Sequence, residues 1–399
     1  MKRIIVIAGK NDVACNALRY LIGTLEYPTE RVKVVLTKKD DGRNTWQESF
    51  AFCARCLGVE IVALDDLYCI KDLLFISLEF DRIIKPNLFV RAELYNFHFS
   101  KLPAYKGSGT SVLPILHGET ESGVTLHQID AGVDTGPIVD QVCFKIERSW
   151  TSRDLYMKFM AVSLDLFKRN IMSLIDGRVV VAQQSSEGAS HYLVDDVGYS
   201  RTEICFRKTA YQIKNHVRAY SFWEYQLSTV GGRKVLAAEI LGERSNRCPG
   251  TEITLSKYES IFSTIDYDVK LKFSPYDDYF AWARGEDDND AFCYVEDLDK
   301  QDPHGWSAAM MAAYYCRSDR LLTLLQKGID VNQCNRRGTT LLMYAKSGCV
   351  RNGCFTCLKL LLQHGASIDA KDAQGNTVFS YLKEEGREDV IEFIKEFKR

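Results

Sequence analysis

Apolar runs rich in β-branched residues alternate with helical patterns in the N-terminal part of the chain, and this alternation constrains the fold most. Residues 3–8 form such a run, which ends at Gly9 and is followed by a helical pattern through Ile22. A second run covers residues 32–36, and a second helical pattern covers residues 45–57. Strands that alternate with helices form a parallel, doubly wound α/β sheet. Ligands of such a sheet bind outside the carboxyl ends of its strands.

The stretch from residue 95 to residue 141 contains side chains that could perform chemistry. Asn96 and His98 lie in an apolar, aromatic run typical of a buried strand, and they share one face because strand side chains alternate. An amide and an imidazole side by side are poor core material, but they can polarise a carbonyl group and accept a proton. Asp134 follows in an Asp-Thr-Gly-Pro turn that could direct its carboxylate towards His98. Taken singly, each residue also has an ordinary structural interpretation.

In this order and spacing, the motifs resemble those of the folate-dependent formyltransferases. The pattern comprises Asn-x-His at 96–98, Ser-x-Leu-Pro at 100–103, a glycine-containing loop and a later Asp before Gly-Pro. The resemblance covers roughly residues 1–260. It implies a Rossmann-like sheet of the formyltransferase fold, a 10-formyltetrahydrofolate co-substrate, an amine acceptor and no metal. It also implies that Asn96, His98 and Asp134 form the catalytic triad.

Overall charge and cysteine content limit the function classes. The chain has 51 basic and 53 acidic residues, a net charge of −2, so no basic field draws it to nucleic acid or to an anionic membrane. The 13 cysteines are spread over the whole chain. The pairs Cys53/Cys56 and Cys354/Cys357 have metal-ligand spacing, but both lie in helical patterns and indicate helix packing. Reduced thiols indicate the cytoplasm. The N-terminal apolar run is too short for a signal peptide, and no apolar run reaches the ~20 residues of a membrane span. We therefore expect a soluble cytoplasmic protein.

The resemblance also implies residues that bind the folate. Leu78, Phe80 and Ile83 lie at the end of a predicted strand and in the following loop, which would form one wall of the pteridine pocket. Core packing is the alternative interpretation for these three residues. We expect Asp130 to shape the pteridine side of the loop that leads to Asp134.

A second set of residues is expected to bind the acceptor substrate: Lys10, Ser100, Tyr105, Gly107, Arg218, Trp223 and Tyr225. Lys10 could contact a diphosphate, and a solvated loop lysine is the alternative. Its loop contains a single glycine, Gly9, whereas a loop that binds a terminal phosphate needs several. This argues against the phosphoribosyl-glycinamide branch of the family. Arg218, Trp223 and Tyr225 suit a phosphate and a planar base, although aromatic residues in a small β domain usually belong to the core.

Composition and pattern divide the chain into three predicted domains. We expect a catalytic domain over residues 1–185 and a small β-rich domain over residues 186–290. Beyond it, the segment that begins at Gly305 aligns with the segment that begins at Gly338. This period, with two helices in each unit, resembles ankyrin repeats. We therefore predict about three α-helical repeats over residues 300–399.

Two acceptors of the family are disfavoured by the sequence: the single loop glycine weighs against phosphoribosyl-glycinamide, and the near-zero net charge weighs against tRNA. A nucleotide-linked amino sugar remains as the expected acceptor. The resemblance is to sugar N-formyltransferases with a C-terminal ankyrin segment. It implies a dTDP-linked amino-dideoxysugar, such as dTDP-3-amino-3,6-dideoxyglucose, for lipopolysaccharide O-antigen synthesis. The expected protein is a homodimer that binds neither nucleic acid nor membrane. The alternatives are a methionyl-tRNA formyltransferase, an ankyrin scaffold with a retired enzyme domain, and hydrolysis of the formyl donor.

Trp306 is an unusual residue for the turn that precedes a repeat helix. The second repeat has Thr339 at the corresponding position. A tryptophan offers a flat face on which a nucleobase can stack. We therefore weigh a second nucleotide site at Trp306 against packing of the repeats on the catalytic domain.

Overall fold

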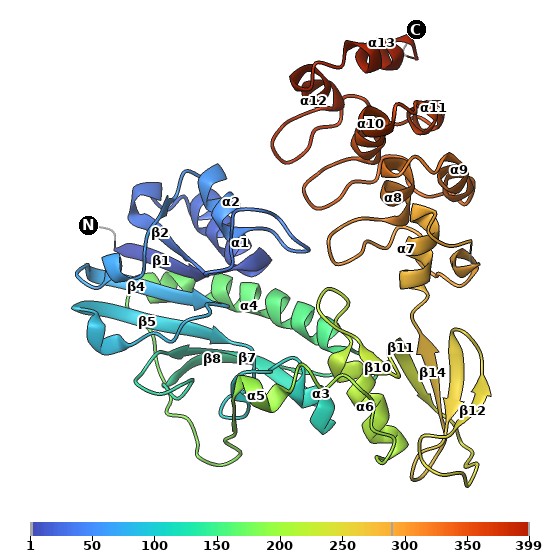
Figure 1. Ribbon diagram of the computed structural model, residues 1–399. Helices are drawn as coiled ribbons and strands as arrows, with labels where there is room; N and C mark the ends of the chain where they lie inside the picture. The colour runs from blue at the N-terminus through green and yellow to red at the C-terminus, as the bar shows by residue number, and fades with distance from the viewer. Residues whose placement is uncertain (1–2, 289, 398–399) are drawn as a thin grey trace. The chain divides into compact units, whose positions relative to one another are not determined.

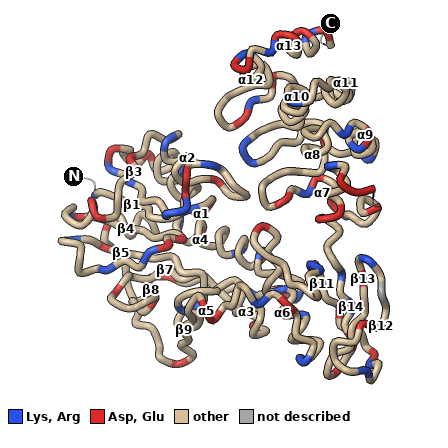
Figure 2. The backbone as a smooth tube through the Cα atoms, viewed as in Figure 1, with Lys and Arg blue, Asp and Glu red and all other residues tan. Residues whose placement is uncertain are grey.

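The computed structural model describes residues 3–288 and 290–397. The chain forms two compact units, Met1–Phe273 and Ser274–Arg399 (Figure 1). Figure 2 shows Lys and Arg interspersed with Asp and Glu in both units, in keeping with the net charge of −2.

A seven-stranded sheet forms the centre of the first unit, in the order β3-β2-β1-β4-β5-β7-β8. The strands are β1 (Ile4–Gly9), β2 (Val32–Leu36), β3 (Glu60–Ile61), β4 (Lys71–Leu78), β5 (Arg91–His98), β7 (Glu121–Gln128) and β8 (Ile138–Lys145). Strands β1 to β5 run parallel, whereas β7 and β8 form an antiparallel hairpin that pairs with β5. The chain first builds outward from β1 through β2 to β3 and then continues on the other side with β4. The crevice between the carboxyl ends of β1 and β4 is therefore the topological switch point, where ligands of such sheets bind.

Three helices of this unit pack on one face of the sheet. They are α1 (Asn11–Arg19), α2 (Phe50–Cys56) and α4 (Ser152–Ile175), and their apolar residues join Ile5 and Ile7 of β1 in one core cluster. The opposite face, with Val6 and Ala8, is covered by the short 3-10 helix η3 (Asp65–Leu67) and by loop residues such as Phe89. The mixed sheet confirms the predicted α/β class. Helices do not cover both faces equally, because the connections that surround β4 are too short to hold a long helix.

The remaining elements of the first unit include the expected β-rich segment. Its five antiparallel strands run in the order β10-β11-β14-β13-β12. They are β10 (Ser228–Val230), β11 (Arg233–Ile240), β12 (Glu252–Leu255), β13 (Glu259–Phe262) and β14 (Val269–Phe273). Helix α6 (Ala210–Tyr220) packs on them through Ile213 and Val217. Shorter elements are α3 (Leu113–His117), α5 (Val194–Val197), η4 (Pro86–Leu88) and the paired strands β6 (Lys106–Gly107) and β9 (His191–Tyr192).

The second unit is helical and repeats one arrangement. After α7 (Tyr276–Arg284), three helix pairs follow: α8 (Ala308–Tyr314) with α9 (Ser318–Gln326), α10 (Leu341–Asn352) with α11 (Thr356–Gln363), and α12 (Val378–Glu384) with α13 (Glu388–Glu396). Ser307, Thr340 and Thr377 cap the first helix of each pair, and each side-chain oxygen accepts a hydrogen bond from a backbone N–H. The repeating cap explains the repeating sequence, because each unit must begin its first helix in the same way.

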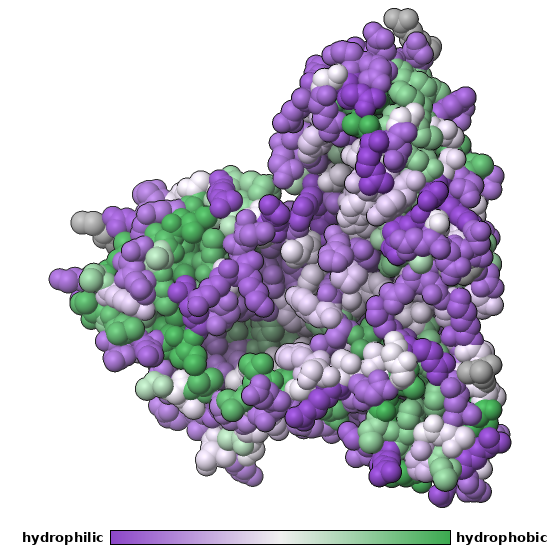
Figure 3. Space-filling view, viewed as in Figure 1, coloured by the Kyte–Doolittle hydropathy of each residue, from purple (hydrophilic) through white to green (hydrophobic). Residues whose placement is uncertain are grey.

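Hydrophilic residues cover most of the visible face of the second unit, whereas the first unit shows a larger apolar area in this view (Figure 3). Within residues 3–288 and 290–397, no helix combines the length and apolarity needed to span a bilayer.

Candidate active site

Asn96 and His98 lie at the carboxyl end of β5, in the interior of the sheet. Strand register places Asn96 opposite His127 of β7, and His98 opposite Thr125. His98 is buried, with 8% of its surface exposed. The alternation predicted from the sequence therefore places both polar side chains where the β7–β8 hairpin can reach them.

Asp134, in the loop between β7 and β8, connects the predicted triad. Its Oδ1 accepts a hydrogen bond from Asn96 Nδ2 at 3.2 Å, and its Oδ2 accepts one from the backbone N–H of Gly107 at 2.9 Å. His98 Nδ1 lies 3.4 Å from Oδ2. The structure thus brings Asn96, His98, Asp134 and Gly107 together, although their segments are separated in sequence.

The environment of Asp134 favours the carboxylate. Burial alone would raise the pKa of Asp134, but His98, His127 and the Gly107 N–H together hold it well below its ordinary value. Ionised Asp134 is thus the negative charge around which the site is built. Its backbone has a left-handed φ of 54°, a strained conformation that occurs often at functional sites. Gln184 holds this loop in place, since its Nε2 donates to the carbonyl oxygens of Asp134 and Gly136 at 2.9 and 2.7 Å.

His98 has a defined tautomer in this site. Its Nε2 lies 2.8 Å from the carbonyl oxygen of Tyr105, and a carbonyl only accepts, so Nε2 carries a hydrogen. In the neutral ring, the bare nitrogen is then Nδ1, which faces Asp134. Burial lowers the pKa of His98, while Asp134 and the Tyr105 carbonyl oppose this shift. A proton taken up at Nδ1 would be held beside the carboxylate, which is the arrangement of a general base with a charged partner.

A second polar cluster lies at the switch point between β1 and β4. Lys10 and Asn11 follow β1, and Glu79 follows β4. Glu79 Oε2 accepts hydrogen bonds from Asn11 Nδ2 at 3.2 Å and from Tyr156 Oη at 2.7 Å. Burial raises the pKa of Glu79. A β-carbon on Gly9 would lie 2.2 Å from the Leu78 carbonyl oxygen, so only glycine permits this close approach.

Aromatic residues gather beside this cluster. Trp46 Nε1 donates to Tyr225 Oη at 3.1 Å, and the Trp46 ring contacts Phe222 and Tyr156 at centroid distances of 5.4 and 5.7 Å. The guanidinium group of Arg153 lies 5.6 Å from the centre of the Trp46 ring. Tyr225, a predicted binding residue, is 67% exposed here. Arg153 is itself paired with Glu224, whose Oε2 accepts from Arg153 Nε at 2.9 Å. This cluster therefore offers exposed aromatic surface close to the switch point.

Other predicted acceptor residues have structural contacts. The guanidinium of Arg218 donates to the carbonyl oxygens of Trp150 at 2.8 Å and Glu147 at 3.1 Å. Ser100 is fully buried, and its hydroxyl donates to the Ala104 carbonyl at 2.8 Å. Trp223 is half-buried in the turn that follows α6. The basic residue that lies against the aromatic cluster is Arg153, which was not predicted from the sequence and which pairs with Glu224.

The predicted folate residues differ in exposure. Leu78 is fully buried, Phe80 is half-buried against Phe75, and Ile83 is 72% exposed. Asp130 accepts hydrogen bonds from the Gly132 N–H at 3.1 Å and from Thr135 Oγ1 at 2.7 Å. Asp130 therefore shapes the loop that carries Asp134.

Tyr105 and Trp306 have aromatic contacts. The Tyr105 hydroxyl donates to Glu119 Oε1 at 2.9 Å, and its ring stacks on Tyr192 at 5.4 Å. In the second unit, the Trp306 ring contacts Tyr314 and Tyr344 at centroid distances of 5.2 and 4.5 Å. Trp306 is thus half-buried in an aromatic cluster of the repeats.

Three further residues of the site were not predicted from the sequence: His127, Glu79 and Tyr156. A signal was present for His127, because an imidazole within an alternating strand pattern must face either the core or a site. A signal was also present for Glu79, because it is a polar residue that directly follows the apolar strand β4. Tyr156 carried no such signal, since it lies in the amphipathic pattern of a long helix.

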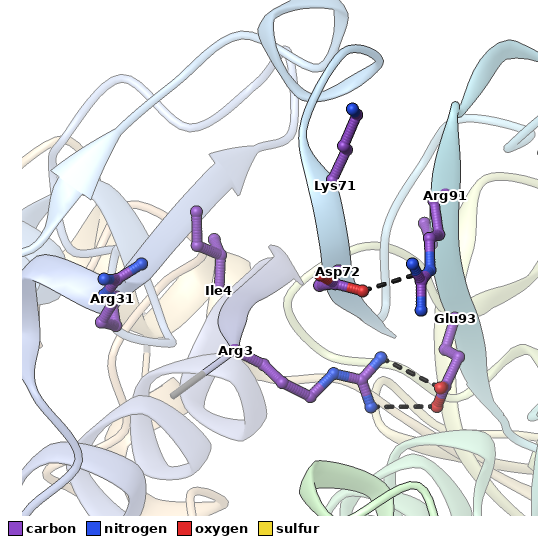
Figure 4. A pocket seen from close by; sticks show the side chains of 8 residues that line it. Arg3, Ile4, Arg31, Lys71, Asp72, Arg91 and Glu93 are labelled. Atoms are coloured by element: carbon purple, nitrogen blue, oxygen red, sulfur yellow. Dashed lines mark hydrogen bonds and ion pairs between the residues drawn. The ribbon is translucent and has the colours of Figure 1, made fainter. Parts of the chain in front are cut away.

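A cavity of about 570 Å³ lies at the other end of the sheet and is separate from this site (Figure 4). It opens where β1, β4 and β5 begin and is lined by charged residues of both signs. Arg3 pairs with Glu93, and Arg91 pairs with Asp72, so much of its charge is neutralised. The carboxyl ends of the strands remain the candidate active site.

One further group of polar side chains lies outside the site. Cys15, Glu48 and Cys53 place possible ligand atoms within 4.8 Å of one another. Arg19 forms an ion pair with Glu48 and so occupies its carboxylate. Cys53 is buried, as predicted for helix packing, whereas Cys56 at the end of α2 is exposed, so that part of the prediction is wrong.

Known proteins match both units of the chain. The formyl transferase family matches residues 72–171, and ankyrin repeats (3 copies) match residues 288–372 and 309–397. The crystal structure of WlaRD, a sugar 3N-formyltransferase in the presence of dTDP and 5-N-formyl-THF, is similar with a TM-score of 0.63. It is 36% identical, and the match covers 68% of this chain and 98% of WlaRD. The N-formyltransferase from Helicobacter canadensis, in complex with folinic acid and dTDP-3-aminofucose, has the same identity and TM-score, with 68% and 100% covered.

Methionyl-tRNA formyltransferases are also similar in sequence. The protein of Sorangium cellulosum (strain So ce56) is 32% identical over 164 residues, 40% of this chain and 51% of that protein. The protein of Clostridioides difficile (strain 630) is 30% identical over 173 residues, 43% and 55%. The chain therefore spans about half the length of the curated relatives it matches.

The strand-end site, the mixed sheet and these similarities define the class: the chain belongs to the formyltransferase family of enzymes. Within this family, the two sugar N-formyltransferases match over almost their entire length, and in this chain an ankyrin-repeat unit follows the matched region.

Proposed function

We propose that the protein transfers a formyl group from 10-formyltetrahydrofolate to the amino group of a dTDP-linked amino-dideoxysugar. The observation that carries this proposal is the convergence of Asn96, His98 and Asp134 at the end of β5. Asn96 and His98 lie on β5, beyond β4 at the switch-point crevice, where an acceptor can approach the formyl donor. WlaRD and the Helicobacter canadensis enzyme were crystallised with dTDP or a dTDP-3-amino sugar and with a formylated folate.

The acceptor would bind at the switch point. Glu79 and Asn11 offer hydrogen-bonding groups suited to sugar hydroxyls, and Tyr156 fixes the Glu79 carboxylate at 2.7 Å. The exposed ring of Tyr225 beside Trp46 offers a face for a base. The specific sugar we propose is dTDP-3-amino-3,6-dideoxyglucose, which would serve lipopolysaccharide O-antigen synthesis in the cytoplasm.

The reaction forms one bond and breaks one. The neutral amine of the sugar attacks the formyl carbon, and a tetrahedral intermediate with a negative oxygen forms. The bond from this carbon to the folate nitrogen N10 then breaks. The proton lost by the amine moves to N10, and His98 with its Asp134 partner is placed to carry it. Loss of one hydrogen bond to such an intermediate typically costs ~2.7–4 kcal/mol of barrier.

The direct test is an acceptor screen with 10-formyltetrahydrofolate and purified protein. We expect turnover with dTDP-3-amino sugars, and slower turnover with dTDP-4-amino sugars. Release of formate without any amine would indicate hydrolysis of the donor. No turnover with any nucleotide-linked amino sugar would contradict the proposal.

Methionyl-tRNA is the second candidate acceptor, because the curated relatives are methionyl-tRNA formyltransferases. The net charge of −2 weighs against it, since tRNA binding depends on basic side chains that neutralise phosphates. Formylation of methionyl-tRNA in the same assay, with tRNA binding that weakens steeply as salt rises, would favour this candidate. A retired enzyme that only recruits partners through its repeats would show neither reaction.

A further inference from the structure

A second cavity of the first unit, with a volume of about 370 Å³, has no part in the reaction above. It is lined by residues of α6, of β11 and of the segment that leads into α4. Part of the lining is aliphatic and includes Leu236 and Ala238 of β11. None of the lining residues belongs to the catalytic triad or to the polar cluster at the switch point.

The charged lining residues of this cavity are all cations: Arg148, Lys214 and Arg218. Within residues 3–288 and 290–397, the side chains of Arg148 and Lys214 have neither an ion pair nor a hydrogen bond. Among the described residues, no acidic side chain lines the cavity. Three positive charges therefore meet here without a counter-charge from the protein.

Arg218 is the most enclosed of these cations. Its guanidinium donates to neutral oxygens, the carbonyls of Trp150 and Glu147 and the side-chain Oδ1 of Asn215. Burial lowers the pKa of Arg218, and no neighbouring carboxylate opposes this shift. A partly buried positive charge without a counter-charge is unfavourable, and an anion bound beside it removes this cost.

Ser221, directly after α6, gives an independent indication of a ligand. The residue is 6% exposed, and its Oγ is buried without a hydrogen-bond partner among the described residues. Nearly all buried polar groups in folded proteins have such a partner. Because Ser221 lines the same cavity, a ligand oxygen can accept the missing hydrogen bond.

We propose that this cavity binds a phosphate monoester with an aliphatic body, at a site separate from the catalytic centre. The phosphate group lies among Arg148, Lys214 and Arg218, which offer charged donors and no competing carboxylate. The aliphatic body lies against Leu236 and Ala238, whose side chains offer neither hydrogen bonds to a sugar nor a ring face to a base. The proposal does not depend on the identity of the acceptor, because no catalytic residue takes part.

Isothermal titration calorimetry on the full-length protein tests the proposal, with hexyl phosphate and inorganic phosphate as probes. We expect one hexyl phosphate per chain, bound at least about tenfold more tightly than inorganic phosphate, because the alkyl chain buries apolar surface. Arg148→Gln/Lys214→Gln should lower the affinity for hexyl phosphate at least about tenfold. Arg207→Gln/Lys208→Gln, at exposed positions before α6, is the matched control. It removes the same charge and should change the affinity less than about twofold.

Ser221→Ala separates a ligand contact from a structural role. The Ser221 hydroxyl has no partner in the described chain, so its removal should not lower the melting temperature of the ligand-free protein. The same substitution should lower the affinity for hexyl phosphate about three- to tenfold. A lower melting temperature with unchanged affinity would contradict the assigned contact.

Other results would overturn the proposal as a whole. These are no binding of hexyl phosphate by calorimetry and thermal shift, equal affinity for the two probes, or an equal loss of affinity in the control pair. Displacement of hexyl phosphate by dTDP would place the cavity within the acceptor site and contradict a separate site. Thermal unfolding reports whether each variant is folded. If the double variant unfolds, Lys214→Gln is measured in its place, with Lys208→Gln as its control.

Discussion

The first unit builds its site from residues distant in sequence, whereas the second unit repeats one local arrangement. Asp134 reaches Asn96 and His98 only because β7 pairs antiparallel with β5 and turns back through a strained loop. In the second unit, each helix pair begins with the same side-chain cap a few residues from the group it bonds.

This difference teaches where function and stability are concentrated. The site holds half-buried polar groups, such as Asp134 and Glu79, that serve an apolar core poorly but suit chemistry. The repeats satisfy their polar groups locally and bury small apolar residues such as Ala309 and Ala312. Substitutions at the strand ends should therefore change turnover far more than stability, and substitutions in the caps should do the reverse.

The largest expected effect is the loss of turnover in His98→Ala and Asn96→Ala. Each removes a group beside the reacting atoms, so we expect kcat to fall at least about 100-fold. Nucleotide binding and the melting temperature should change little. His364→Ala, at an exposed position in the second unit, is the control. Turnover within about threefold of wild type in either site variant would show that the assigned roles are wrong.

Asp134→Asn should lower turnover and also change how stability depends on pH. The pKa of Asp134 is lower in the folded protein than its ordinary value. The ionised carboxyl therefore stabilises the fold above the unfolded pKa of about 3.9, and this contribution disappears as pH falls through the folded pKa. Chemical unfolding across pH should show wild type about 1–3 kcal/mol more stable at pH 7, with the gap narrowing only under strongly acidic conditions. A gap that grows on acidification would contradict this.

Glu79→Gln should affect acceptor binding more than chemistry. It removes the charge that Asn11 and Tyr156 surround, so we expect KM for the dTDP-amino sugar to rise about tenfold, with kcat within about threefold. Steady-state kinetics at saturating folate measures both constants. Asp81→Asn, an exposed carboxylate in the same loop, is the matched control. An unchanged KM in Glu79→Gln would place the acceptor elsewhere.

A nucleotide site at Trp306 would mean that both units bind nucleotide. We propose that it stacks on a nucleobase at a second, non-catalytic site. Calorimetry with dTDP should then report two sites per chain, falling to one in Trp306→Ala while turnover is retained. Tyr315→Ala, a partly exposed ring in the same unit, should keep both. A single site in the wild-type protein would end this proposal.

The smallest expected effect is on the repeats alone. Thr377→Ala removes the cap of α12, whose side chain accepts from the Ser380 N–H. This should cost about 1 kcal/mol of stability and leave kcat and KM unchanged. Thermal unfolding compared with Ser367→Ala, an exposed hydroxyl outside any helix, provides the measurement. Loss of turnover in Thr377→Ala would contradict the separation of the two units' roles.

The sequence predicted those features that depend on local pattern. The alternation of strand and helix gave the α/β class, and the repeated Gly305 and Gly338 segments gave the helix pairs. Asn96 and His98 were found because polar residues at the end of an apolar strand are conspicuous. Arg153 and Tyr156 were not, because their positions depend on how α4 packs against the sheet. The contacts of Arg218 were not predicted, because its neighbours in sequence do not decide its partners. In the folded protein, its guanidinium group donates hydrogen bonds to backbone carbonyl oxygens from a distant part of the chain.

The central claim is that formyl transfer to a nucleotide-linked amine occurs at the end of β5. A crystal structure of the full chain with 5-formyltetrahydrofolate and dTDP-3-amino-3,6-dideoxyglucose tests it most directly. We predict the sugar amine beside Asn96 and His98, with the sugar ring near Glu79. A sugar bound only in the second unit, or an amine remote from Asn96 and His98, would contradict it.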